Sequence, residues 1–408
     1  MNHTTHAART QSHALLPIPT ADTFGACSTL FELGGMIVIH DPSGCNSTYT
    51  THDEPRWYHQ DALLFISALT EYDAILGRDD KLIHDIETAA EEFHPSFICI
   101  LPSQIAHLIA TDLPAISRII QRHTGLPTFT LPTNSMHSYD KGIEYALEHL
   151  ARHLVEISSQ PNAGTTRTQG QTSRSHAILR AGLGFHNPRV NLLGLTPLDF
   201  HWQRALPSLK SFLTSHRLAF AASLTLSTTL EEIAQNAPVA DVNLVLAKSA
   251  LPAAHILEKG LGIPYIAAVP YPPVADEIAE ALRLAAKEKK SRILYEGHRS
   301  STPPSSQSRF NNFLLTEHLA AASIQSALAK CGHLFSILSP PTSEPSFQST
   351  LTHAALLISD PLYFPLAPVT VRTIPLPHRA ISSRTFEKKE RNLLDQAEWA
   401  AFLKELQP

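Results

Sequence analysis

Short apolar runs alternate with segments of helical periodicity along most of this chain. Met36–His40 and Ser96–Leu101 are typical of strands buried on both faces, and apolar residues recur at helical spacing between them. A helix that ends at Gly125, a short strand at Thr128–Leu131 and a long helix with one apolar face follow. Strands that alternate with helices form parallel sheets, so residues 20–157 are predicted to form an N-terminal α/β domain.

The same alternation recurs twice more, and polar stretches separate the repeats. A second α/β domain is predicted at residues 176–290, and a third at residues 291–408 with a C-terminal helical tail. The separating stretches, 158–175 and 299–308, are rich in Ser, Thr, Pro and Gln and lack apolar periodicity. A chain of 408 residues is also too long for one ordinary core. The predicted fold class is therefore α/β, with three Rossmann-like doubly wound parallel-sheet domains.

Local signals place several elements of the second and third domains. Thr228 and Glu231 have the spacing of a capping box, which predicts a helix start at Thr228. Arg292–Tyr295 is predicted to be the first strand of the third domain, followed by a helix across Leu314–Leu328.

Charge and hydropathy exclude several classes of function. The 32 basic and 37 acidic side chains give a net charge of -5, with no Lys/Arg-rich block to attract a nucleic-acid backbone. Apolar runs end well before the ~20 residues of a membrane span, and the N-terminus lacks the apolar core of a secretory signal. We therefore expect a cytoplasmic protein with no nucleic-acid or membrane partner. No glycine-rich phosphate loop is present, so any nucleotide would be bound by another protein.

Four cysteines in a reducing compartment indicate packing, catalysis or metal binding rather than disulfides. Cys45 lies in a Pro-Ser-Gly-Cys turn after a predicted strand, where backbone N–H groups would favour a thiolate that binds iron. Cys27 precedes the same strand. Two thiolates do not complete a four-thiolate site, but a symmetric dimer could supply two from each chain. The pattern leaves a second interpretation open, in which both cysteines are buried packing residues.

Five motifs, in this order, have counterparts in one known family. A cysteine is followed by a buried strand that ends in IHDPSGC, and then by EYDAILGRDDKL and QIAHLIATD. Later segments read VNLLGLTPLD and LEKGLGIPYIAAVPYP. Together they resemble the nitrogenase component 1 family, which includes the molybdenum–iron protein, its cofactor-assembly scaffold and the dark-operative protochlorophyllide and chlorin reductases. The resemblance covers roughly Cys27–Pro272 and fades toward the C-terminus.

The resemblance implies a metal site. It implies that Cys27 and Cys45 are ligands of an iron–sulfur cluster. Because Gln104 stands where the family has a third cluster cysteine, it further implies one 4Fe-4S cluster shared across a dimer. Cys99 lies inside a predicted strand and Cys331 in a turn that ends a helix, and both are interpreted as structural.

The resemblance also implies a cofactor-binding cavity. His137 and Tyr139 follow a strand end, where parallel sheets bind ligands, and the family places its cofactor there, so both are predicted to be cofactor-binding. His201 is a further candidate, and His40 is expected to orient its loop. No thiolate lies near Leu246–Ala247, where nitrogenase anchors its large cofactor, so reduction of dinitrogen on a cofactor held in that way is not expected.

Three functions remain open at this point. The first is a reductase, working as a homodimer or with a related chain, that receives electrons from a nitrogenase iron-protein-like ATPase. The second is a non-catalytic scaffold or carrier on which a metal cofactor is assembled. The third is a periplasmic-type ligand-binding fold, which would require a secretion signal.

Overall fold

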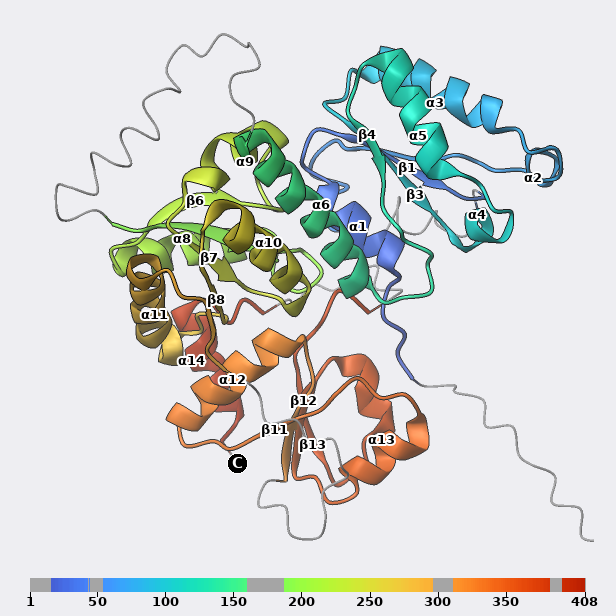
Figure 1. Ribbon diagram of the computed structural model, residues 1–408. Coiled ribbons are helices and arrows are strands. Elements are labelled where there is room, and N and C mark those ends of the chain that lie inside the picture. Colours follow the sequence, from blue (N-terminus) through green and yellow to red (C-terminus); the bar gives the residue numbers. More distant parts are fainter. Residues whose placement is uncertain are drawn as a thin grey trace, which may run out of the picture.

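Three parallel sheets, each flanked by helices, make up the protein in the computed structural model, which describes residues 16–42, 44, 54–159, 187–295, 311–381 and 391–407. Figure 1 shows the three resulting units, with the long helix α6 (Tyr139–Ser159) between the first and second sheets. Every strand pairing within the sheets is parallel. The predicted fold class is thus confirmed. No helix of the described residues is long and apolar enough to cross a membrane.

The first sheet has the strand order β2-β1-β3-β4 and a core on each face. Along β1, Met36 and Val38 pack against α3 and α5, whereas Ile37 and Ile39 pack against α1 and α6, as the two-residue period of a strand requires. The helix α5 ends at Gly125, as predicted. The strands are β1 (Met36–His40), β2 (Leu63–Ile66), β3 (Ile98–Pro102) and β4 (Thr128–Thr130). The helices before α6 are α1 (Asp22–Leu30), α2 (Glu71–Leu76), α3 (Asp79–Phe93), α4 (Gln104–Leu108) and α5 (Leu113–Thr124).

The second sheet has the order β6-β5-β7-β8-β9. Its strands are β5 (Arg189–Leu193), β6 (Ala219–Ser223), β7 (Val242–Val245), β8 (Tyr265–Ala267) and β9 (Arg292–Ile293). Its helices are α8 (Ala205–Ser215), α9 (Leu230–Asn236), α10 (Leu251–Leu261) and α11 (Ala275–Glu288), with short 3-10 turns η2 (Ala237–Val239), η3 (Lys248–Ala250) and η4 (Pro272–Val274).

Two local predictions in this region are wrong by small margins. The capping box is formed by Thr229 and Glu232 rather than by Thr228 and Glu231, because Thr229 has the extended backbone that an N-cap needs. The strand predicted to open the third unit forms as β9, but it pairs with β8 at the edge of the second sheet. The polar stretch 299–308 and most of 158–175 lie outside the described residues.

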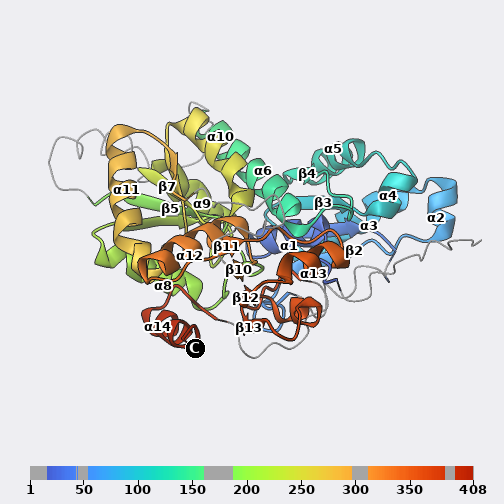
Figure 2. The same cartoon turned by 90° about the horizontal axis from the view of Figure 1, so that it is seen from below.

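The third sheet has the order β11-β10-β12-β13. Its elements are β10 (Asn312–Leu314), α12 (His318–Lys330), β11 (Ser336–Ile337), α13 (Glu344–Leu351), β12 (Leu356–Ser359), η5 (Pro361–Leu366) and β13 (Arg372–Pro375). The predicted C-terminal helix forms as α14 (Gln396–Glu405) and packs on the second unit beside α8 (Figure 2). There the indole of Trp399 stacks on Tyr271, with 5.6 Å between ring centroids.

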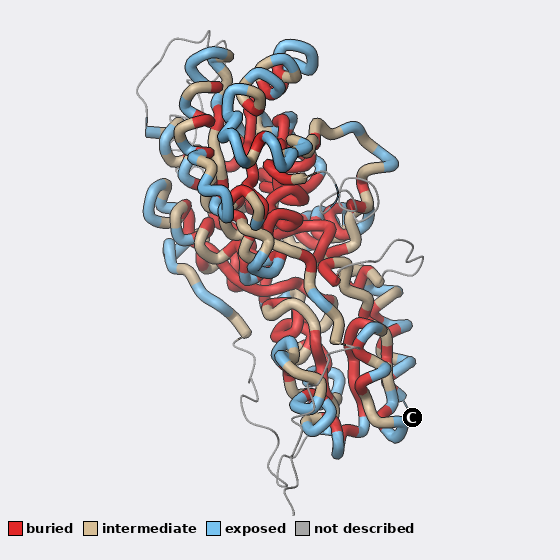
Figure 3. Tube along the Cα trace, turned by 90° about the vertical axis from the view of Figure 1, so that its right-hand side faces the viewer, coloured by how far each residue is buried: buried red, intermediate tan, exposed pale blue. Residues whose placement is uncertain are grey.

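Helices α1 and α6 cross in direct backbone contact, and α6 in turn joins the first unit to the second. A Cβ atom added to Gly25 would overlap the carbonyl of Tyr139, and one added to Gly142 would overlap the carbonyl of Asp22. Beyond the crossing, α6 packs against α10, so a single core runs from the first sheet into the second. Figure 3 shows this buried interior in red. The crossing fixes the start of α6, where the functional site begins.

Candidate functional site

A cavity of about 240 Å³ lies where the three units meet. Its lining residues follow strands of all three sheets, so the carboxyl ends of these strands converge on one space. That is the edge at which parallel sheets bind ligands. The titratable lining residues used below are Tyr139 after β4, Asp199 after β5, Lys248 after β7, Glu317 after β10, Asp360 after β12 and His378 after β13.

One carboxylate oxygen joins side chains from all three units. Oδ1 of Asp199 accepts hydrogen bonds from the Tyr139 hydroxyl at 2.6 Å and from Nε2 of His378 at 2.8 Å. Its second oxygen accepts from the hydroxyl of Thr196 at 3.3 Å. The Asp199 side chain is only 1% exposed. In this contact Nε2 of His378 is the donor to the Asp199 carboxylate. A neutral His378 ring therefore carries its proton on Nε2 and leaves Nδ1 as a hydrogen-bond acceptor.

Burial and the nearby Asp199 charge raise the pKa of Tyr139 well above its usual value. The phenol therefore remains a hydrogen-bond donor at any physiological pH. The backbone N–H of His378 donates to Asp360 Oδ2 at 2.8 Å, which holds the histidine loop after β13 against the end of β12. The hydroxyl, carboxylate and imidazole form a fixed polar group on one wall of the cavity.

Glu317 forms another part of the wall. It is the N-cap of α12, where its Oε2 accepts from the N–H of Ala320 at 2.8 Å. Its Oε1 reaches the second unit and accepts from the N–H of Lys248, also at 2.8 Å. Burial, followed by the charge of Asp199, raises the pKa of Glu317 to about 7. A raised pKa makes this carboxyl easier to protonate than an ordinary glutamate.

The structure brings Tyr139 into the cavity but leaves His137 outside its lining. Tyr139 is the first residue of α6, and its N–H donates to the carbonyl of Thr20 at 2.8 Å. The His137 side chain is 51% exposed, and its Nδ1 lies 3.3 Å from Asp22 Oδ2.

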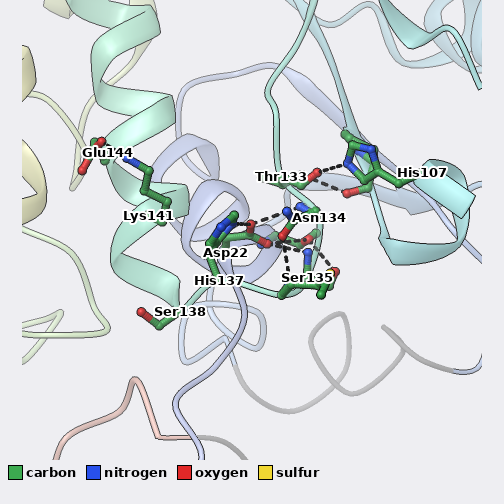
Figure 4. Close-up of polar contacts among 12 residues, drawn as sticks. Asp22, His107, Thr133, Asn134, Ser135, His137, Ser138, Lys141 and Glu144 are labelled. Carbon is green, nitrogen blue, oxygen red and sulfur yellow. Dashed lines mark hydrogen bonds and ion pairs between the residues drawn. The ribbon is translucent and has the colours of Figure 1, made fainter. Parts of the chain in front are cut away.

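Asp22 organises the loop between β4 and α6. The carboxylate accepts the N–H groups of Asn134 and Ser135 at 3.1 and 2.7 Å, and Ser135 has a positive φ of 57°. Figure 4 shows Asn134, Ser135 and His137 turned toward Asp22, while His107 bonds the carbonyl of Thr133 nearby. Asp22, the first residue of α1, thus fixes the position of this loop. The loop leads directly into Tyr139, which lines the cavity.

Comparison with known proteins identifies the family. The profile described as "Nitrogenase component 1 type Oxidoreductase" matches residues 22–287, well over half of the chain. The chain belongs to this family. The nitrogenase component 1 family thus accounts for the first two units, and the solved structure "Nitrogenase Cp1 at pH 6.5" shares the fold over 97% of this chain and 93% of its own, with a TM-score of 0.62 at 14% identity.

Curated relatives in the family have different roles. The nitrogenase iron-molybdenum cofactor biosynthesis protein NifN of Nostoc sp. is 26% identical over 62% of this chain and 56% of its own length. A subunit of the light-independent protochlorophyllide reductase of Prosthecochloris aestuarii is 25% identical over 57% of this chain and 39% of its own. This chain therefore spans about half or less of the curated relatives it matches.

The described cysteines do not fit the metal site that the family suggests. Cys27 lies inside α1 rather than before it, is 0% exposed, and belongs to the core that joins α1, α6 and β3. Burial raises the pKa of its thiol well above the usual value, which disfavours the thiolate that iron requires. Cys45 lies outside the described residues. Among those described, no group of three or more His, Cys, Asp or Glu side chains could hold a metal ion.

The remaining sequence candidates have local roles in the structure. Cys99 is buried in β3 and Cys331 is exposed after α12. His40, at the end of β1, contacts the Ser67 hydroxyl through Nδ1 at 2.9 Å, and burial lowers its pKa. His201 accepts from Nε of Arg204 at 2.9 Å and does not line the cavity.

Five of the six titratable cavity residues named above were not predicted from the sequence: Asp199, Lys248, Glu317, Asp360 and His378. Asp199 ends the motif VNLLGLTPLD, so a polar residue beyond a strand end was a usable signal. Glu317 and His378 belong to the third unit, where the family resemblance has faded. Only the converging strand ends bring them to Asp199.

Proposed function

We propose that this chain is the substrate-reducing component of a two-component reductase. It would receive electrons from a nitrogenase iron-protein-like ATPase and reduce a small molecule in the cavity between the three units. The observation that carries the proposal is the polar group Tyr139–Asp199–His378 with Glu317 beside it, because reduction at a polar bond consumes protons as well as electrons.

The cavity restricts the substrate by size. Its 240 Å³ is below the ~300–1,000 Å³ of sites that enclose drug-sized ligands, which favours a small substrate over a tetrapyrrole. Lys248, which lines the cavity and is exposed, offers a cation to a polar substrate. We therefore propose a compact polar substrate, oriented by Tyr139 and Lys248.

Cys45 is the cysteine that we propose as a ligand of an iron–sulfur cluster. Such a cluster would supply one-electron transfer when bound. Cys27 is assigned to packing, because its buried surroundings in α1 do not fit a ligand. With Cys27 assigned to packing, a symmetric dimer of this chain would supply only two thiolates. We therefore propose that the working form pairs this chain with a related one that supplies the remaining cluster ligands.

Nucleotide-dependent electron transfer tests the proposal. The full-length protein, purified without oxygen, is mixed with a pre-reduced nitrogenase-type iron protein, with and without MgATP. We expect oxidation of the iron protein, followed by its visible absorbance, to be much faster with nucleotide. Equal rates with and without MgATP would contradict the proposal.

A scaffold for a metal cofactor is the second candidate, and one observation favours it. NifN of Nostoc sp., a relative named for cofactor biosynthesis, matches 62% of this chain. The two functions differ in how many electrons each chain consumes, since a scaffold is used stoichiometrically and a reductase turns over.

A further inference from the structure

Glu317 is an unusual residue for the structural position that it occupies. As the N-cap of α12 it satisfies one backbone N–H, a task that Ser, Thr, Asp or Asn performs best. The longer Glu side chain also reaches across to the N–H of Lys248 in the second unit. It thereby lies near the Asp199 carboxylate, whose negative charge opposes ionisation of Glu317. A shorter cap would avoid this repulsion, so capping alone does not explain a Glu here.

The groups around Glu317 favour its protonated form on balance. The two N–H donors and the nearby His378 stabilise the carboxylate, but burial and Asp199 outweigh them and raise the pKa of Glu317 to about 7. Burial raises the pKa of the phenols of Tyr139 and Tyr271, and the charge of Glu317 raises both further. Neither phenol therefore competes with Glu317 as a proton donor. The side chain of Glu317 is only partly buried, and it lines the cavity.

We propose that Glu317 is the proton donor to the substrate bound in the three-unit cavity. This inference rests on the proposed reductase function and names the acid that such a reductase needs. As electrons from the ATP-dependent iron protein reach the substrate, the O–H bond of Glu317 breaks and its proton bonds to the reduced substrate atom. The remaining carboxylate, held by the N–H groups of Ala320 and Lys248, is then re-protonated from solvent. A general acid is most effective when it titrates near the working pH.

A direct titration tests the proton on Glu317 without any substrate. Infrared spectra of the full-length protein between pH 5 and pH 9 follow the carbonyl stretch of protonated carboxyl groups. We expect one band to disappear near pH 7 in the wild type and to be absent in Glu317→Gln, which keeps an oxygen acceptor for α12. Glu280→Gln, on the exposed surface of α11, is the matched control and should retain the band. In Asp199→Asn the midpoint should fall, because the opposing charge is gone.

Turnover then tests the role of that proton. Hydroxylamine is a suitable probe because its N–O bond is cleaved by two electrons and two protons to give ammonia and water. With the iron protein and MgATP, Glu317→Gln should lose about 10²-fold or more of ammonia formation and lose the fall in rate above pH 7. Its MgATP-dependent first electron uptake should stay unchanged.

The outcomes separate the inference from the proposed function. An infrared band that persists in Glu317→Gln, or a variant with the wild-type rate and pH profile, would overturn the role of Glu317 while leaving the reductase intact. Absence of MgATP-dependent electron uptake in the wild type would overturn the reductase itself. A shift of the band's midpoint in Asp199→Asn together with the altered pH profile supports the inference.

Discussion

At the scale of single residues, the same residue type has different chemistry in different surroundings. The place of Cys27 before a strand predicts an iron ligand, yet this residue lies inside α1, within a core shared with β3 and α6. Every residue of this helix is buried, so the surroundings of Cys27 are those of a packing residue. Cys45, which lies outside the described residues, keeps the proposed ligand role.

Iron analysis distinguishes the two cysteines. Cys45→Ala should lose the iron that anaerobic reconstitution gives the wild type. Cys27→Ala should keep it and lose about 1 kcal/mol or more of unfolding free energy, because a small buried side chain is removed. Iron per chain and a denaturant titration measure both effects. Loss of iron in Cys27→Ala with unchanged stability would restore Cys27 as a ligand.

A second residue-scale prediction concerns stability and pH. The folded-state pKa of Glu317 is raised from its ordinary value of 4.5 to about 7, so the folded state holds this proton more tightly than the unfolded chain. The resulting stabilisation is present below about pH 4.5 and is lost as pH rises through about 7. Glu317→Gln has no carboxyl at this position, so its stability does not fall in this way as pH rises. Its melting temperature relative to wild type should therefore be higher at pH 8 than at pH 5, measured by thermal unfolding with Glu280→Gln as control. A difference that does not depend on pH would contradict the raised pKa.

At the scale of elements, the crossing of α1 and α6 decides where Tyr139 lies. Gly25 and Gly142 let the two backbones touch, and Tyr139 is the first residue of α6. A looser crossing would move the start of α6 away from Asp199, and the hydrogen bond that joins the first two units would lengthen.

Gly142→Ala tests the crossing. A Cβ there meets the backbone carbonyl of Asp22, which cannot rotate away, so we expect a loss of at least about 2 kcal/mol of unfolding free energy. This loss occurs although Ala is the better helix former by about 1 kcal/mol. Gly260→Ala in α10 is the control, because the atoms nearest to its Cβ belong to the side chain of Val155 rather than to backbone, so the cost should be smaller. Equal losses in the two variants, measured by denaturant titration, would show that the crossing is not specially tight.

Much of this element-scale structure could be predicted from the sequence. The apolar runs and the glycine that ends α5 give β1, β3 and α5 with small errors, since periodicity and helix stops are local properties. The edge strands β2, β6 and β13 were missed, because short and partly exposed strands have little apolar signal. The strand β10 was also missed: the helix predicted across Leu314–Leu328 begins only at His318, and Leu314 belongs to β10. The convergence of Asp199, Glu317 and His378 could not be predicted, since it depends on how three sheets pack rather than on any local pattern.

At the scale of the whole molecule, one cavity receives strand ends from all three sheets. The Asp199 carboxylate of the second unit accepts hydrogen bonds from Tyr139 of the first unit and His378 of the third. The three units are therefore joined at the place where a ligand would bind. A ligand there contacts every unit at once. This arrangement suits a reaction in which substrate, proton donor and electron donor are held in fixed relation.

The number of electrons consumed per chain distinguishes a reductase from a cofactor scaffold. The protein is supplied with its iron protein, excess reductant, MgATP and hydroxylamine, and ammonia is measured against a mixture that lacks this chain. We expect many turnovers per chain, dependent on MgATP and strongly reduced in Glu317→Gln. Electron uptake that stops at a few equivalents per chain, with no ammonia above the control, would contradict it and indicate a cofactor scaffold.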